Sequence, residues 1–140
     1  MKQSVLIVDD EPMTRDLLRL MLERAGFDIS EAEDGIDALE KIKDSTPDAV
    51  ILDVMMPHMD GITVCEILRR QEETADLPVL MLSARTHMDA IEQGLRAGAT
   101  RYLSKPVSRQ DLIQNLREAI AGIPSPETQL LRERLIGNQD

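Results

Sequence analysis

The chain of 140 residues has few aromatic residues and almost no cysteine: it contains no tryptophan, one tyrosine, one phenylalanine and one cysteine. The single Cys65 excludes an internal disulfide framework and is typical of a reducing compartment, so we interpret it as a small buried helix residue. The apolar runs are too short to cross a bilayer, and the N-terminal residues lack the anatomy of a signal peptide. We therefore expect a cytoplasmic protein without membrane insertion.

Positive charge is also scarce. The sequence has 16 basic and 26 acidic residues, which gives a formal net charge of −10, and the basic residues are dispersed rather than clustered. Nucleic acid and anionic membranes need a local basic patch, so we expect no direct nucleic-acid binding by this chain. Its hydrophobic content of 42% and its length are typical of one globular domain.

Two hydrophobic periodicities alternate along the chain. Short β-branched runs predict five strands, at residues 5–8, 28–32, 49–52, 79–82 and 101–103. Apolar residues at three- and four-residue steps predict helices at about 12–25, 35–44, 60–70 and 86–97, and a fifth that begins after Ser108. Asp60 and Ser108 are the expected caps of the third and fifth helices. Strict alternation predicts an α/β fold: a doubly wound five-stranded parallel sheet with five helices, with the more polar 28–32 as an edge strand.

Two prolines within residues 122–129 interrupt the pattern, and proline disfavours helix at the residue before it. We therefore expect a domain at residues 1–121 and a tail at residues 122–140. Ser125 and Pro126 could begin a short tail helix, which would carry Leu130, Leu131 and Leu135.

Polar side chains that could carry chemistry lie at or just after the ends of the first, third, fourth and fifth predicted strands. Asp9 and Asp10 follow the first strand, Asp53 the third, Ser83 the fourth, and Lys105 comes soon after the fifth. In an open parallel sheet the carboxyl ends of the strands form the ligand-binding edge. We therefore expect three carboxylates, a hydroxyl and an ammonium to converge on one rim.

Carboxylates that converge in this way indicate a cation site. Each pair a few ångströms apart repels by roughly 4 kcal/mol at an effective dielectric of about 20, and a hard divalent cation removes that cost. Asp53 could then attack a phosphorus atom, while Lys105 neutralises the developing charge and Ser83 donates to a phosphoryl oxygen. The simpler alternatives are that Asp10 and Glu11 cap the first helix, that Ser83 caps the fourth, and that Lys105 is a solvated surface residue.

Four motifs occur in order across residues 3–121: "VLIVDDEP", "VILDVMMPHMDG", "PVLMLSA" and "GATRYLSKP". Together with the five strand–helix units, they resemble the receiver domain of two-component response regulators. The resemblance implies a flavodoxin-like sheet with strand order 2-1-3-4-5. It also implies a phosphorylation-operated switch, in which Asp53 accepts a phosphoryl group from a sensor histidine kinase or a phosphotransfer protein.

The resemblance assigns further roles. Mg²⁺, or Mn²⁺ in its place, would be held directly by Asp10, Asp53 and the backbone carbonyl of Met55, and by Asp9 mainly through water. Ser83 and Lys105 would bind the phosphoryl oxygens, and Tyr102 would be the switch aromatic. The side chains of Met55 and Arg85 would flank the path of the hydrolytic water and so tune dephosphorylation.

The resemblance also indicates a partner-binding face on the fourth helix, fifth strand and fifth helix. On this chain the face would carry Asp89, Glu92, Arg96, Arg101, Asp111 and Arg117. We expect a monomer or a weak phosphorylation-dependent dimer, with Arg101 where related dimers usually have an acid. The chain is then either a stand-alone regulator or the receiver of a larger protein whose output domain binds this face.

Other folds and activities fit less well. A Mg²⁺-dependent phosphatase with an aspartyl nucleophile generally needs an acid two residues later, where this chain has Met55. A flavin-binding module needs a hydroxyl- and glycine-rich loop after the first strand, where this chain has "DDEP". A degenerate receiver that only binds partners would not need the full acidic set and Lys105. We therefore expect a phosphoacceptor rather than a turnover enzyme.

Overall fold

The computed structural model describes residues 2–125, 129 and 133. Its elements, in chain order, are β1 (Ser4–Val8), α1 (Pro12–Arg24), β2 (Asp28–Ala32), α2 (Gly35–Asp44), β3 (Ala49–Asp53), α3 (Gly61–Arg70), the 3₁₀ turn η1 (Glu72–Thr74), β4 (Val79–Ser83), α4 (Met88–Arg96), β5 (Arg101–Ser104) and α5 (Arg109–Ile120). The strands are parallel in the order β2-β1-β3-β4-β5. The predicted fold, strand order and edge position of β2 are confirmed.

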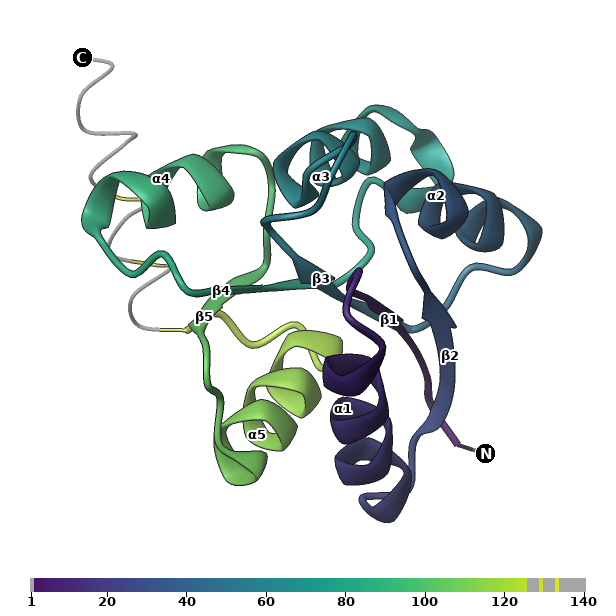
Figure 1. Ribbon diagram of the computed structural model, residues 1–140. Coiled ribbons are helices and arrows are strands. Elements are labelled where there is room, and N and C mark those ends of the chain that lie inside the picture. Colours follow the sequence, from purple (N-terminus) through teal and green to yellow (C-terminus); the bar gives the residue numbers. More distant parts are fainter. Residues whose placement is uncertain (1, 126–128, 130–132, 134–140) are drawn as a thin grey trace.

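Helices cover both faces of the sheet, α1 and α5 on one side and α2, α3 and α4 on the other (Figure 1). Alternate residues of β1 enter the two cores. Val5 and Ile7 belong to the cluster that contains residues of α1 and α5, whereas Leu6 and Val8 belong to the cluster with α2 and α3. Burial on both faces explains why the central strands are continuously apolar. In β1, β3 and β4, polar side chains therefore lie only at the strand ends.

The predicted helix caps form as expected. The side chain of Asp60 accepts a hydrogen bond of 2.8 Å from the Thr63 N–H, and the Ser108 hydroxyl accepts one of 3.1 Å from the Asp111 N–H. Each satisfies an amide that the first turn of a helix leaves unpaired. These caps fix where α3 and α5 begin.

Helix α4 begins at Met88, two residues later than the sequence predicts. The reason lies in the preceding loop, where Arg85 is held by side chains at both of its backbone groups. Its N–H donates to the Ser83 hydroxyl at 3.0 Å, and its carbonyl accepts from the Tyr102 hydroxyl at 2.8 Å. Such side-chain partners compete with helical hydrogen bonds and keep this loop out of the helix.

Cys65 is fully buried in α3, as expected. Burial raises the pKa of its thiol to about 11, so the reactive thiolate is scarce at neutral pH. The leucines of the predicted tail helix, Leu130, Leu131 and Leu135, lie outside the described residues. Residues 129 and 133, the two that are described beyond residue 125, are both helical. The domain boundary at residue 121 stays a prediction. None of the helices described combines the length and the apolar character that crossing a bilayer requires.

Candidate functional site

Two buried carboxylates lie side by side at the carboxyl ends of neighbouring strands. Asp9 follows Val8 of β1 and Asp53 follows Leu52 of β3, and those two apolar residues are direct partners in the sheet. Asp9 is 2% exposed and Asp53 5%, whereas the neighbouring Asp10 is exposed. One carboxylate oxygen from each of the three lies within 4.8 Å of the others. The structure thus brings together the three acids that the sequence indicates.

Lys105 bridges the two buried carboxylates. Its Nζ lies 3.2 Å from Asp9 Oδ2 and 3.2 Å from Asp53 Oδ1. Its backbone N–H donates to the Ser83 carbonyl at 2.9 Å, which holds the start of the β5–α5 loop against the end of β4. Lys105 is therefore no solvated surface residue: it supplies the cation beside two buried anions.

The pKa values of these groups follow from their surroundings. Burial, and then the charge of Asp9, raises the pKa of Asp53 above its usual value, against the opposing effect of Lys105 and the Met55 N–H. Burial alone would lower the pKa of Lys105, but the charges and hydrogen bonds of Asp53 and Asp9 outweigh it, so that pKa is raised. The net rise for Asp53 means that burial and the charge of Asp9 together outweigh the opposing effects of Lys105 and the Met55 N–H.

The backbone around Asp9 is fixed by two contacts. Its Oδ1 accepts from the Glu11 N–H at 2.9 Å, and its carbonyl accepts from the guanidinium of Arg15 at 2.6 Å. Glu11 occupies the cap position of α1 without bonding the helix backbone, and its carboxylate accepts from the Thr14 hydroxyl instead. The capping alternative therefore does not account for these acids.

Two residues that shape this site, Arg15 and Gly61, were not predicted from the sequence. Gly61 packs closely against the backbone of Asp53. A Cβ at Gly61 would lie 2.4 Å from the Asp53 carbonyl oxygen and 2.9 Å from Val54 Cα. Only glycine permits this approach of α3 to the end of β3, and the Gly61 N–H donates to the Val54 carbonyl at 2.9 Å. The Asp-Gly pair at 60–61 was the available signal, because glycine at a helix start often marks a close backbone contact.

Ser83 is fully buried at the end of β4. Its hydroxyl accepts from the Arg85 N–H, whereas the cap position of α4 is His87. The alternative in which Ser83 caps the fourth helix is therefore wrong. Tyr102, on β5, is partly buried and donates its hydroxyl to the Arg85 carbonyl.

Met55 follows Asp53 closely in the chain, and it shares a hollow with Arg85. Met55 is 52% exposed, and its N–H donates to Asp53 Oδ1 at 3.3 Å. Both line one hollow of about 390 Å³, together with Val54, Met56, Asp60, Ile62 and Gln93. The two residues expected to flank the hydrolytic water thus share one cavity wall.

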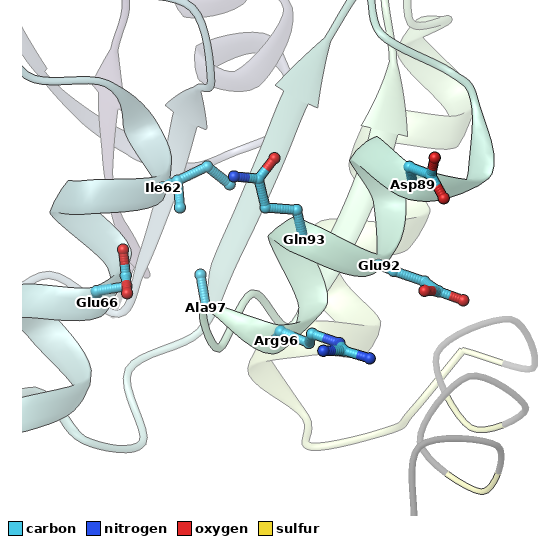
Figure 2. Close-up of a pocket in the computed structure, with 7 residues that line it drawn as sticks. All are labelled: Ile62, Glu66, Asp89, Glu92, Gln93, Arg96 and Ala97. Atoms are coloured by element: carbon cyan, nitrogen blue, oxygen red, sulfur yellow. The ribbon is translucent and has the colours of Figure 1, made fainter. Parts of the chain in front are cut away.

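A second hollow, of about 470 Å³, separates α3 from α4. It is lined by Ile62, Glu66, Asp89, Glu92, Gln93, Arg96 and Ala97, and Gln93 reaches across toward Ile62 (Figure 2). It shares Ile62 and Gln93 with the hollow beside Met55 but includes none of the clustered carboxylates. This second hollow is therefore separate from the carboxylate cluster.

The expected partner face needs one correction. Arg101 is 4% exposed, and its guanidinium donates to Asn115 Oδ1 at 2.8 Å and to the Ile123 carbonyl, with Glu118 Oε1 at 3.9 Å. Because side chains alternate along a strand, Arg101 faces α5 while Tyr102 faces α4. Arg101 is therefore buried against α5, and it is not one of the exposed charges of the expected partner face.

Comparisons with known proteins agree with this geometry. The response regulator receiver domain family matches residues 5–117. The "DNA-binding dual master transcriptional regulator RpaA" of Synechocystis sp. is 43% identical over 113 residues, 81% of this chain and 47% of that protein. "Response regulator MprA" of Mycobacterium ulcerans is 43% identical over 117 residues, 84% of this chain and 50% of that protein. The chain thus spans about half the length of the curated relatives it matches.

Two solved structures are similar over nearly their whole length. A putative response regulator from Chloroflexus aurantiacus is 38% identical with a TM-score of 0.84, covering 86% of this chain and 99% of that one. The receiver domain of a sensor histidine kinase from Pseudomonas aeruginosa PAO1, with magnesium coordinated in its active-site cleft, is 30% identical with a TM-score of 0.80, covering 86% and 99%. The chain belongs to the family of response regulator receiver domains, the signalling switches of two-component systems.

Proposed function

We propose that Asp53 accepts a phosphoryl group from the phosphohistidine of a sensor histidine kinase or a phosphotransfer protein, and that this modification switches the chain's partner binding. The observation that carries the proposal is the place of Asp53: 5% exposed, at the carboxyl end of a central strand, with Asp9 beside it and Lys105 at 3.2 Å. A buried carboxylate with a raised pKa and a charged partner is typical of a reactive site.

In the proposed step, a carboxylate oxygen of Asp53 attacks the phosphorus. The new O–P bond forms as the P–N bond to histidine breaks, and the imidazole leaves with the electron pair and takes up a proton. Lys105 already lies against Asp53 and would neutralise charge on the transferring oxygens. The Ser83 hydroxyl accepts from Arg85 N–H and so keeps its own hydrogen to donate to a phosphoryl oxygen.

The donor set suits a hard divalent cation. Asp9, Asp10 and Asp53 offer clustered carboxylate oxygens, the ligand type that Mg²⁺ prefers. We expect the backbone carbonyl of Met55 to complete the protein ligands and Mn²⁺ to substitute for Mg²⁺. The bound cation would offset the repulsion among the carboxylates and the charge of the phosphoryl group. Asp53 phosphorylation should therefore need the metal.

After transfer, Tyr102 would act as the switch aromatic and Met55 with Arg85 would govern the lifetime of the aspartyl phosphate. The chain would catalyse its own phosphorylation and dephosphorylation without being a turnover enzyme. Output would pass through the face of α4, β5 and α5, to a downstream protein or an attached output domain. We expect a cytoplasmic monomer or weak phosphorylation-dependent dimer, and the net charge of −10 argues that this chain itself does not bind nucleic acid.

The test is intact mass after incubation with acetyl phosphate, with Mg²⁺ or with a chelator. The wild type should gain about 80 Da, one phosphoryl group, with Mg²⁺ only, and Asp53→Asn should gain none. Asp16→Asn, an equal charge change on the exposed face of α1, should behave as the wild type. A gain of the same mass by Asp53→Asn would overturn the assignment.

A further inference from the structure

Helix α4 contains a glycine where helix propensity disfavours one. Gly94 lies inside the helix and is buried, although glycine there costs about 1 kcal/mol relative to alanine. A Cβ at this position would lie 2.7 Å from Tyr102 Cδ2, 3.0 Å from Tyr102 Cε2 and 3.0 Å from Met81 Sδ. Met81 is fully buried whereas Tyr102 is only partly buried, so the tyrosine ring is the group that would have to move. The Tyr102 ring therefore occupies the space that a side chain at position 94 would fill.

The other end of the tyrosine reaches the loop that Ser83 begins. The Tyr102 hydroxyl donates to the Arg85 carbonyl at 2.8 Å, and the Arg85 N–H donates to the Ser83 hydroxyl oxygen at 3.0 Å. Arg85 is thus held at both backbone groups. Because the Ser83 oxygen is used as an acceptor from Arg85, its own hydrogen stays available to donate toward the rim.

We propose that Gly94 is a positioning residue for phosphoryl binding. By admitting the Tyr102 ring against α4, it lets the hydroxyl hold Arg85, and Arg85 in turn orients the Ser83 hydroxyl. The proposal rests on the proposed function, in which Ser83 contacts the phosphoryl group. Gly94 itself touches none of the clustered carboxylates in the described contacts, so its effect is on the phosphoryl group and not on the metal.

The proposal predicts that a change at Gly94 weakens phosphoryl binding without changing metal binding. Gly94→Ala should displace the ring, release Arg85 and weaken binding of beryllofluoride, a phosphoryl mimic, to the Mg²⁺-loaded protein. We expect a loss of roughly 5- to 20-fold, in the lower part of the range that is typical of coupling between two sites. Affinity for Mg²⁺ alone should stay at the wild-type value, because the side chain of Asp9 bonds the Glu11 N–H and the Lys105 ammonium rather than Arg85 or Tyr102. A general destabilisation of the fold would not weaken beryllofluoride binding while leaving Mg²⁺ binding unchanged.

The experiment is a double-mutant cycle of Gly94→Ala and Tyr102→Phe, with dissociation constants for Mg²⁺ and for beryllofluoride measured by calorimetry. Tyr102→Phe removes only the hydroxyl, so it should also weaken beryllofluoride binding. Adding Gly94→Ala to that variant should then cost little more. Arg96→Ala, at an exposed position of α4 that does not line the hollow beside Met55 and Arg85, controls for a change to alanine in the same helix. Because Tyr102 is the only tyrosine and tryptophan is absent, intrinsic fluorescence reports directly on ring displacement in Gly94→Ala.

The outcomes are distinct. Weaker beryllofluoride binding in both single variants, without additivity and with unchanged Mg²⁺ affinity, supports the proposal. Wild-type beryllofluoride affinity in Gly94→Ala, or additive losses in the double variant, overturns it and leaves the proposed function standing. A wild type that binds no beryllofluoride overturns both. Should Gly94→Ala fail to fold, an undiminished affinity in Tyr102→Phe alone would still refute the relay.

Discussion

Lys105 Nζ lies 3.2 Å from Asp53 Oδ1, and the same ammonium lies 3.2 Å from Asp9 Oδ2. Lys105 follows the edge strand β5, whereas the two acids end the inner strands β1 and β3. One partly exposed cation therefore compensates two buried anions that the sheet topology forces together. We therefore expect this arrangement to oppose folding in the absence of a second cation and to favour the binding of one.

Replacing Lys105 with methionine should destabilise the metal-free protein, because it leaves both buried carboxylates without a cation. We expect the free energy of unfolding to fall by about 1–3 kcal/mol, less than for a fully buried pair because Lys105 is partly exposed. Urea denaturation in a chelator measures the loss. Lys43→Met, at an exposed position of α2, is the matched control. An equal loss in the two variants would mean that the bridge contributes nothing.

Asp53→Asn should have the opposite effect and stabilise the metal-free protein, by about 1 kcal/mol. The folded state raises the pKa of Asp53, so its ionisation opposes folding, and stability is lost as the pH rises through that pKa. The gain from Asn should therefore be largest at neutral pH and shrink as the pH falls toward 3.8, the ordinary value of the carboxyl.

Thermal stability in the presence of Mg²⁺ tests whether the cation binds at these carboxylates. A cation that binds the folded state alone raises the melting temperature by linkage. The rise should be smaller in Asp53→Asn and Asp10→Asn than in the wild type, in scanning calorimetry at equal Mg²⁺. Identical rises in all three proteins would place the cation elsewhere.

Met55→Asn should shorten the lifetime of the aspartyl phosphate, by about threefold or more, because an amide can orient a water that a thioether cannot. Met55 is 52% exposed and lines the same hollow as Arg85, so the new side chain would reach the path of the water. The measurement is the decay of phosphorylated protein after removal of the donor. Met88→Asn, also 52% exposed, is the control. Unchanged or slower decay in Met55→Asn would contradict this role.

Arg101→Glu should disrupt the fold rather than an interface between copies. The new carboxylate would be buried beside Glu118 and the Ile123 carbonyl, at a cost of about 3 kcal/mol or more. Arg101→Met should cost less, since its stem packs similarly and the Arg101 Nε already lacks a hydrogen-bond partner among the described residues. Arg96→Glu, exposed on α4, should change unfolding by no more than about 0.5 kcal/mol. Equal stabilities of the Arg101→Glu and Arg96→Glu proteins in urea would refute the burial argument.

Much of this structure could be predicted because its signals are local. The caps Asp60 and Ser108 bond amides three residues away, and the rim acids follow directly from where apolar strands end. Three features could not be predicted for the converse reason. Arg15 and Gly61 contact the backbone at the end of the preceding strand, across a loop in which no periodicity of the sequence indicates which residues meet. Arg101 is buried because Asn115 of α5 and the Ile123 carbonyl accept its hydrogen bonds.

The identity of the phosphorylated atom tests the central claim most directly. Borohydride reduces an acyl phosphate to an alcohol, which converts a phosphorylated aspartate to homoserine, a residue about 14 Da lighter than aspartate. After phosphorylation with Mg²⁺ and reduction, peptide mass spectrometry should find this change at Asp53 alone, and not in a sample treated with chelator. Homoserine at Asp9 or Asp10, or no reduction at Asp53 in a protein that has gained a phosphoryl group, would contradict the account.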